Sequence, residues 1–245
     1  LSWGGDINGD GFDDIIIGAQ YDDGQGAAGN RGAGRTYVVF GSDTRGSAEV
    51  SVEKLLTTPD GAFSISGQGT NYYFGASVSG AGDVNGDGFA DILVGEKPLS
   101  FGASQVYVIF GNDLGNLALD MSGNLDATAL SGTDGFVMQD GQFGSYFGRS
   151  LTGLGDVNGD GFDDFGVGAP SATNNLGNYS AGVVYVVFGQ ATFNATQSAG
   201  SLDGTNGFAI HGESDFRDFG RELVALGDIN GDGFADIGVS GATVD

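Results

Sequence analysis

The sequence predicts an all-β fold made of repeated four-stranded antiparallel units, and three observations support this. The string G-D-[IV]-N-G-D-G-F-x-D, rich in aspartate and glycine, occurs four times. Glycine accounts for 49 of the 245 residues, as expected for a chain with many tight turns. Short runs of Val, Ile, Tyr and Phe, which favour pleated and half-buried surfaces, separate these turns.

Other sequence features keep the same phase as the repeated string. The first aspartate of each copy is Asp6, Asp83, Asp156 or Asp228, which gives spacings of 77, 73 and 72 residues. Before the later copies stand the Phe-Gly pairs 74–75, 147–148 and 219–220. After the first three copies come the apolar runs 37–41, 107–111 and 185–189, followed by 63–67, 136–141 and 208–212. Each period is therefore one structural unit.

Each period contains four short strands. Strand A carries Phe-Gly and ends in the Asp-rich loop, as in 74–82, and strand B leaves the loop, as in 91–95. Strand C is the Tyr-Val-Val-Phe run and strand D is the Phe-x-Ile run. Four-stranded antiparallel units that repeat radially are β-propeller blades. The period exceeds the 40–50 residues of common propellers, and the excess lies in the loops and in the C–D connectors, 42–61, 112–134 and 190–206.

The repeats divide the chain into one propeller segment, 1–245. We expect repeats at about 1–72 (N-truncated), 73–145, 146–217 and 218–245 (C-truncated). In strands this is B-C-D, A-B-C-D, A-B-C-D and A-B, a partial or open arc of about three to four blades. Such an arc is expected either as an excerpt of a longer polypeptide or as a subunit whose ends are covered by neighbours.

Charge and composition exclude several functional classes. The chain has 32 acidic and 8 basic residues, a net charge of −24. This argues against nucleic-acid binding, which needs a basic stripe. No apolar run approaches the roughly 20 residues needed to span a bilayer, so direct membrane insertion is not expected. Cysteine is absent, so the fold has no disulfide framework.

The repeated loop has the donor pattern of a Ca²⁺ site. In the first copy Asp6, Asn8 and Asp10 alternate at positions 1, 3 and 5, so a tight turn brings their side-chain oxygens together. Phe12 at position 7 offers its backbone carbonyl, and Asp14 at position 9 completes the set. Five or six hard oxygens with three negative charges suit Ca²⁺ better than Mg²⁺, which demands octahedral geometry. The loop has no Cys or His, which argues against Zn²⁺.

Two alternatives to this interpretation are weaker. An ordinary Asn-Gly or Asp-Gly hairpin turn needs two such residues, whereas here four oxygen donors alternate in four copies. An EF-hand or dockerin loop needs an acidic residue at position 12 on an emerging helix. Position 12 is instead occupied by apolar residues, Ile17, Val94, Val167 and Val239.

The chain resembles the FG-GAP repeat family, best known from the N-terminal β-propeller of integrin α subunits. The shared motifs are Phe-Gly-x-Ser-Val/Leu (74–78, 147–151), the Asp-rich loop and Gly-Ala-Pro (168–170). The resemblance implies about four Ca²⁺ ions. Its implied ligands in copy one are Asp6, Asn8, Asp10, Phe12 and Asp14; in copy two Asp83, Asn85, Asp87, Phe89 and Asp91; in copy three Asp156, Asn158, Asp160, Phe162 and Asp164; and in copy four Asp228, Asn230, Asp232, Phe234 and Asp236.

The chain departs from the family pattern in several places. Copy one lacks Phe-Gly, and Gly-Ala-Pro becomes Gly18-Ala19-Gln20 and Gly95-Glu96-Lys97-Pro98. Arg149 and Arg221 follow Phe-Gly, either paired with neighbouring acids or on a solvated strand edge. The connectors resemble those of large bacterial surface proteins of this family. That likeness implies a secreted or cell-surface setting rich in Ca²⁺.

Three functions are compatible with these features. The first is a Ca²⁺-binding extracellular module for adhesion, with a protein or glycan surface ligand. The second is a structural subunit that assembles with its neighbours in a filament or surface layer. The third is the non-catalytic propeller part of a secreted hydrolase. No catalytic residue is expected: His211 stands alone, and the repeat assigns the second acid of Asp13-Asp14 and Asp163-Asp164 to metal and the first to solvent.

Overall fold

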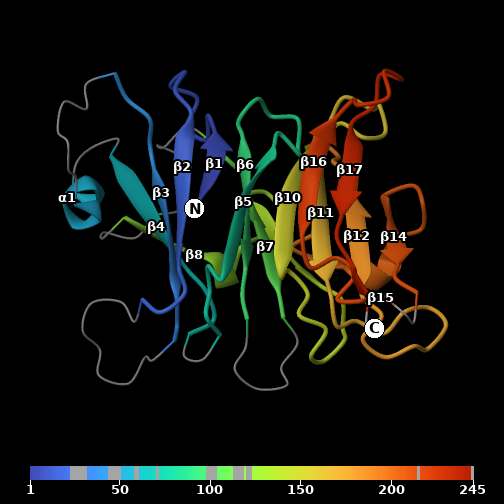
Figure 1. Ribbon diagram of the computed structural model, residues 1–245. Helices are drawn as coiled ribbons and strands as arrows, with labels where there is room; N and C mark the ends of the chain where they lie inside the picture. Colours follow the sequence, from blue (N-terminus) through green and yellow to red (C-terminus); the bar gives the residue numbers. More distant parts are fainter. Residues whose placement is uncertain are drawn as a thin grey trace.

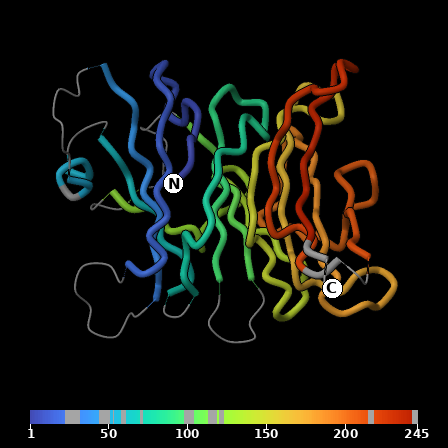
Figure 2. Tube along the Cα trace, in the orientation of Figure 1, coloured from blue at the N-terminus to red at the C-terminus, as the bar shows by residue number. Residues whose placement is uncertain are grey.

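The chain folds as a row of β-sheets that lie side by side. The computed structural model describes residues 1–22, 32–43, 51–57, 61–69, 72–97, 104–112, 119, 123–213 and 216–243. In Figure 1 blade one lies on the left, blade two in the centre and blade three on the right, where the terminal hairpin overlaps it in this view; the trace in Figure 2 passes from one to the next in chain order. The sheets do not close into a ring. The expected all-β fold of propeller blades in an open arc is therefore confirmed.

The three blades each contain four antiparallel strands in the order A-B-C-D. Blade one consists of β1 (Ser2–Gly5), β2 (Asp14–Ala19), β3 (Arg35–Val39) and β4 (Ala62–Ser66). Blade two consists of β5 (Ser77–Gly82), β6 (Asp91–Gly95), β7 (Val106–Ile109) and β9 (Gly135–Gln139). Blade three consists of β10 (Ser150–Gly155), β11 (Asp164–Ala169), β12 (Val183–Val187) and β14 (Gly207–His211). These strands coincide closely with the apolar runs of the repeat.

The fourth repeat contributes shorter strands. Its A and B strands are β16 (Leu223–Gly227) and β17 (Asp236–Val239), and β15 (Phe216–Arg217) pairs with β18 (Ala242–Thr243).

One expectation for the first repeat is wrong. Copy one was expected to lack strand A because it has no Phe-Gly. Ser2–Gly5 nevertheless form β1, which pairs with β2 from Ser2 opposite Ile16 to Gly5 opposite Asp14. The hairpin needs only the residues just before the Asp-rich loop, so it forms without the Phe-Gly turn. The described chain therefore has three four-stranded blades and one hairpin.

The C–D connectors contain structure that the repeat pattern did not predict. β8 (Asn124–Asp126) lies in the connector of repeat two but pairs in parallel with β4 of blade one. β13 (Thr196–Ser198) likewise joins β9 of blade two from repeat three. A short 3₁₀ turn follows each strand, Ala127–Ala129 and Ala199–Ser201. Each connector thus reaches back to the preceding blade and ties two repeats together.

The first connector carries the helix α1 (Val52–Leu56). Residues 44–50 and 58–60 of this connector, and 113–118 and 120–122 of the next, lie outside the described residues, as does Pro98. No helix in the described parts of the chain is long and apolar enough to cross a membrane.

Apolar side chains fill the spaces between consecutive blades. One cluster joins blades one and two around Phe63, Phe74 and Tyr107, and another joins blades two and three around Phe136 and Phe165. The Phe-Gly phenylalanines Phe74 and Phe147 are fully buried. Their rings lie edge-on to Tyr107 and Tyr185 of strand C in their own repeats, with centroids 5.1 and 5.6 Å apart.

Glycines allow neighbouring blades to approach closely. A Cβ atom on Gly168, at the end of β11, would lie 2.0 Å from the Gly220 carbonyl oxygen, and one on Gly18 would lie 2.2 Å from that of Gly75. No side chain fits such a gap. The Gly of Phe-Gly and the Gly near the end of strand B are therefore points of very close backbone contact between successive repeats.

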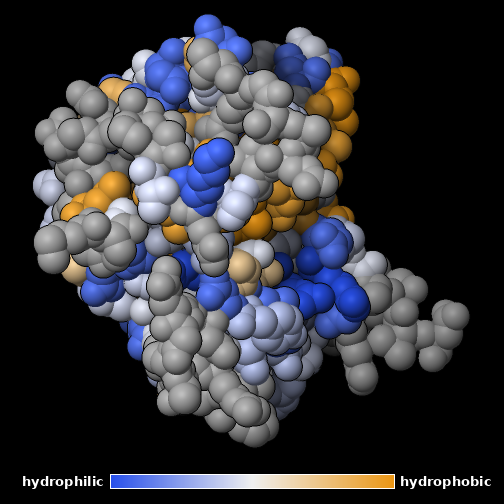
Figure 3. Space-filling view, turned by 90° about the vertical axis from the view of Figure 1, so that its left-hand side faces the viewer, coloured by the Kyte–Doolittle hydropathy of each residue, from blue (hydrophilic) through white to orange (hydrophobic). Residues whose placement is uncertain are grey.

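The two outer sides of the arc are less well covered than its centre. The strand residues of β6 and β11 are all buried, whereas most of those in β16 are exposed. On blade one, Leu1, Trp3 and Ile15 are exposed apolar residues. Figure 3, which views the blade-one side of the molecule, shows hydrophobic surface along one edge and in a recess.

Candidate metal centres

The four predicted ligand sets all lie in the loops between strands A and B. These loops project from one end of the sheets, at the top of Figure 1. A β-bulge precedes each loop at Gly5, Gly82, Gly155 or Gly227. These four glycines have φ between 65° and 78°, which bends strand A as it enters the loop. The same backbone device therefore positions every loop.

Within a loop, the side chains at positions 1, 3 and 5 accept hydrogen bonds from the loop's own backbone. In copy two the Asp83 carboxylate accepts from the N–H groups of Asp87 (3.0 Å) and Gly88 (2.8 Å). The Asn85 amide oxygen accepts from the Asp87 N–H at 2.9 Å, and Asp87 accepts from the Phe89 N–H at 3.0 Å. These bonds turn the side-chain oxygens inward over a tightly wound backbone.

The same pattern recurs in the other copies. Asp6, Asp156 and Asp228 each accept from the N–H groups at positions 5 and 6, at 2.8 to 3.1 Å. Asn8, Asn158 and Asn230 accept from the position-5 N–H, and Asp10, Asp160 and Asp232 from the N–H of Phe12, Phe162 or Phe234. Four stretches of similar sequence thus adopt the same local structure.

The position-9 aspartate links each loop to its blade. Asp91 is fully buried, and its carboxylate accepts from the N–H of Val84 (2.8 Å) in the loop and of Gly111 (2.9 Å) after strand C. Asp14 and Asp164 make the equivalent pairs of bonds, to Ile7 and Gly41 and to Val157 and Gly189. Asp236 accepts from the Ile229 N–H and from the Asn230 side-chain amide, both within its own loop.

Burial disfavours the charged form of the position-9 carboxylates. The pKa of Asp91 is raised to about 8, chiefly by burial and to a smaller extent by the nearby charges of Asp87 and Asp83, against the lowering effect of the two backbone hydrogen bonds. Burial raises the pKa of Asp14 and Asp164 to about 6 in the same way. A buried negative charge surrounded by further carboxylates is the environment that a cation relieves.

Consecutive loops are stacked on one another. The ring of Phe89 lies over Gly9 of the preceding loop, where a Cβ atom would come within 2.5 Å of it. Phe162 covers Gly86 in the same manner, and Phe234 covers Gly159. The position-7 residue therefore serves two loops, because its backbone belongs to one and its side chain packs on the previous one.

One predicted role is corrected by this stacking. The first acid of the Asp163-Asp164 pair was expected to face solvent. Its carboxylate instead accepts from the backbone N–H of Asp83 at 2.9 Å, and its own N–H donates to the Asp83 carbonyl at 3.1 Å. Asp163 thus ties loop three to loop two. Asp13, its counterpart in the first loop, is exposed as expected.

The donor set of each loop fits Ca²⁺ in chemistry. Each offers three carboxylates, one amide oxygen and one backbone carbonyl, all hard oxygen donors. Among the described residues, no three acidic or imidazole side chains already form a closed metal-binding group. Closing such a cage requires carboxylate oxygens at positions 1, 5 and 9 to be directed toward a shared centre, and a carboxylate that accepts backbone hydrogen bonds still has lone pairs for this.

The single histidine of the chain lies away from these loops. His211 is exposed at the end of β14, opposite Val183 in the sheet.

Known proteins share the repeat. The family model described as FG-GAP repeat matches residues 1–39, 74–109 and 147–187, which are strands A to C of the three blades. A phosphatidylinositol-glycan-specific phospholipase D of Rattus norvegicus is 32% identical over 191 residues, which cover 76% of this chain and 20% of that protein.

Integrins are similar to a comparable extent. Integrin alpha-4 of Xenopus laevis is 30% identical over 188 residues, 76% of this chain and 16% of that protein. Integrin alpha ina-1 of Caenorhabditis elegans is 34% identical over 176 residues, 68% of this chain and 14% of that protein. The chain spans a fifth or less of the length of these relatives.

Proposed function

Because the chain belongs to the FG-GAP repeat family, we propose that it is a Ca²⁺-stabilised extracellular β-propeller module that binds a protein or glycan surface ligand. The observation that carries the proposal is the repetition of one loop structure. Four loops share the donor sequence, the preceding bulge and the backbone hydrogen bonds to positions 1, 3 and 5. A turn that served only to reverse the chain would not need three carboxylates at fixed spacing in each copy.

The residues that would hold the ion are the side chains at positions 1, 3, 5 and 9 and the carbonyl at position 7 of each loop. When bound, Ca²⁺ supplies positive charge that offsets the mutual repulsion of the loop carboxylates. Asp91 and its counterparts, already anchored to strand C through Gly111, Gly41 and Gly189, would connect the ion to the blade. The proposed role of the ions is to rigidify one end of the sheets.

The module is proposed to be non-catalytic, with function residing in its surface. The two kinds of relative suggest two settings for such a module. Similarity to integrin α subunits supports adhesion, and similarity to a phospholipase D supports a propeller that accompanies a secreted hydrolase. The two similarities cover the same share of the chain, 76% in each case, so coverage does not choose between the settings. Both settings require blades that bind Ca²⁺, so Ca²⁺ binding by the loops is the first property to test.

Calorimetric titration of the full chain tests the proposal. Ca²⁺ is expected to fill about four sites and to bind more tightly than Mg²⁺. Asp87→Asn should remove one site, whereas the matched substitution Asp13→Asn, which removes the same charge from an exposed residue, should leave the number of sites unchanged. Equal affinity for the two cations, or equal loss of binding in both variants, would show only diffuse attraction to an acidic protein.

A further inference from the structure

Three of the eight basic residues of this acidic chain line one surface cavity. Lys97, Arg149 and Arg221 surround a cavity of about 190 Å³ together with Asp218, Tyr146, Pro170 and Ser171. We call these seven residues the basic groove. Lys97 follows β6, whereas Arg149 and Arg221 precede β10 and β16, so the groove lies at the end of the sheets opposite the Asp-rich loops. No part of the proposed Ca²⁺ chemistry uses it.

A comparison of two equivalent Phe-Gly turns explains why Arg149 has no ion-pair partner among the described residues. Arg149 and Arg221 occupy the same position in the Phe-Gly turn, and each backbone N–H donates to the residue three before it, Tyr146 at 2.9 Å and Asp218 at 3.0 Å. Tyr146 and Asp218 both adopt left-handed conformations, with φ of 55° and 62°. Asp218 pairs with Arg221 at 3.3 Å. Tyr146 has no carboxylate to offer, and Arg149 makes no ion pair with any residue the structure describes.

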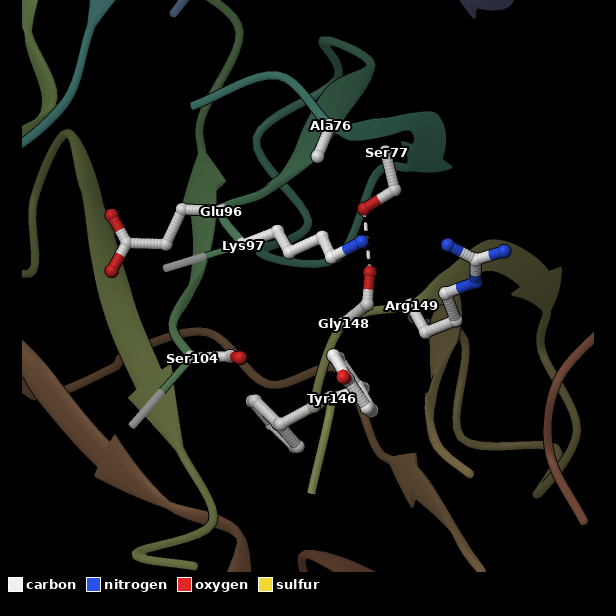
Figure 4. A pocket seen from close by; sticks show the side chains of 9 residues that line it. Ala76, Ser77, Glu96, Lys97, Ser104, Tyr146, Gly148 and Arg149 are labelled. Atoms are coloured by element: carbon white, nitrogen blue, oxygen red, sulfur yellow. Dashed lines mark hydrogen bonds between the residues drawn. The ribbon is translucent and has the colours of Figure 1, made fainter. Parts of the chain in front are cut away.

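Lys97 adds a second positive charge without an acidic partner in the described parts of the chain. Its ammonium group lies 5.7 Å from the centre of the Tyr146 ring. Figure 4 shows Lys97 and Arg149 reaching away from the Glu96 carboxylate, which points to the other side of the strand. With the Asp218–Arg221 pair neutral overall, the groove carries a net charge of about +2, in contrast to the −24 of the whole chain.

The chemistry of the groove selects a small anion. A guanidinium group presents paired N–H donors that match the two oxygens of a carboxylate. The cavity of about 190 Å³ is many times the space of about 10–15 Å³ that one water needs, so it has room for a ligand of several atoms. A single aspartate or glutamate side chain would leave much of it unfilled, whereas one sugar ring with a carboxylate would occupy it. The Tyr146 ring and Pro170 supply apolar contacts for the ring carbons, and the Ser171 hydroxyl is a hydrogen-bonding group for its hydroxyls.

The negative charge of the rest of the chain further limits which anions can bind in the groove. A long polyanion would experience repulsion from the surrounding acidic surface, because only a local patch is positive. A single charged sugar at the end of a neutral chain avoids this penalty. We propose that the basic groove binds one carboxylated sugar residue, with its carboxylate held by Arg149 and Lys97.

Calorimetric titration of the full chain with glucuronate, in saturating Ca²⁺, tests this inference. Glucuronate should bind, and glucose, which lacks the carboxylate, should not bind measurably. Tyr146→Asp would give the Arg149 turn the internal acid that Asp218 supplies to the next turn, and should weaken binding at least tenfold. Tyr146→Asn, which tolerates the same backbone conformation without the charge, loses only the ring contact and should weaken binding clearly less than Tyr146→Asp does.

The remaining variants separate the groove from the loops. Arg149→Gln should weaken glucuronate binding at least tenfold while leaving the Ca²⁺ titration unchanged, so the failure of one proposal does not imply failure of the other. Asp218→Asn, which frees Arg221, should strengthen binding. The inference is overturned if wild-type chain binds glucuronate no better than glucose, or if Arg149→Gln and Tyr146→Asp bind as wild type. Binding of inorganic sulfate or an Asp-Asp-Asp tripeptide as tight as that of glucuronate would overturn the assignment to a sugar.

Discussion

The hydroxyl of Ser150 donates a hydrogen bond to the carbonyl of Gly220, 2.8 Å away in the next repeat. Ser77 donates to the Gly148 carbonyl in the same way. In each case the serine of one Phe-Gly-x-Ser motif holds the Phe-Gly turn of the following copy. The motif is therefore a connection between blades, and its conformation in one repeat depends on the repeat that follows.

Replacing Ser150 by alanine should weaken the junction between blade three and the fourth repeat. The Gly220 carbonyl would lose a donor at a buried contact, a change that costs about 1–2 kcal/mol. The free energy of unfolding, measured in urea, should fall by that amount. Ser79→Ala is the matched control, because the Ser79 hydroxyl donates to the adjacent Gly80 carbonyl within its own strand. A loss of equal size in both variants would contradict the interpretation.

The strand positions and the loops could be predicted because each is repeated. The expected strand B at 91–95 and strand A at 74–82 correspond to Asp91–Gly95 and Ser77–Gly82. Features that depend on contact between repeats could not be predicted from the sequence. β8 and β13 are three-residue strands whose partners lie in the preceding blade, and no local periodicity marks them.

The same limit applies to individual side chains. The link from Asp163 to Asp83 and the grouping of Lys97 with Arg149 and Arg221 arise only when neighbouring repeats are placed together. The internal pairing of Arg221 with Asp218, three residues apart, was within reach of sequence reasoning. The contrast with Tyr146 at the equivalent position could have signalled the unpaired Arg149.

Removing Ca²⁺ should destabilise the chain strongly. A ligand present at 100 times its dissociation constant stabilises the folded state by about 2.7 kcal/mol per site, and four sites together approach the stability of a typical domain. EGTA should therefore lower the melting temperature by well over ten degrees, and added Ca²⁺ should restore it. An unchanged thermal melt in EGTA is the result that this prediction forbids.

Loss of the Asp163 carboxylate should loosen the contact between loops two and three. Asp163→Ala removes the acceptor for the Asp83 N–H, and we expect a loss of about 1 kcal/mol of stability in saturating Ca²⁺. Asp13→Ala removes the same group from the first loop, where it is exposed, and should change stability by less than about 0.5 kcal/mol. Urea unfolding of the two variants side by side measures the difference. Equal changes in stability in the two variants would show that Asp163, like Asp13, only faces solvent.

Glu96 occupies a position unsuited to a charge. It replaces the alanine of Gly-Ala-Pro, and its counterpart Ala169 is fully buried. Only 3% of Glu96 is exposed. One carboxylate oxygen accepts from the Tyr107 hydroxyl at 3.2 Å, and the other has no partner among the described residues. Burial raises the pKa of Glu96 from 4.5 to about 8, and the Tyr107 hydrogen bond opposes this only in part.

Glu96 should make stability fall as pH rises from about 4.5 to 8. In this window the unfolded chain has released the Glu96 proton while the folded chain retains it, so the folded state binds more protons and loses stability with increasing pH. Glu96→Gln and Glu96→Ala remove the titration, and each should be more stable than wild type at pH 8 by a few kcal/mol at most. The difference should shrink toward pH 4.5. Parallel pH profiles for wild type and Glu96→Gln would refute the assignment.

The last prediction concerns the uncovered face of the fourth repeat. Val224 and Leu226 alternate on β16 and are 51% and 43% exposed, whereas the corresponding strands β5 and β10 each contact the first strand of the following repeat. They flank Gly238 of β17, so the apolar surface is continuous across the hairpin.

A sheet face of this kind promotes association through burial of apolar area. The 245-residue chain should therefore show concentration-dependent association in sedimentation and bind an apolar dye. Replacing Val224 and Leu226 together by threonine keeps the β propensity of the strand and should reduce both signals. Leu176→Thr with Tyr179→Thr is the matched control, since these residues are 79% and 89% exposed but lie in a loop. If the control reduces association equally, general surface apolarity is responsible; if only the β16 variant does, the chain associates through the face that another blade would cover.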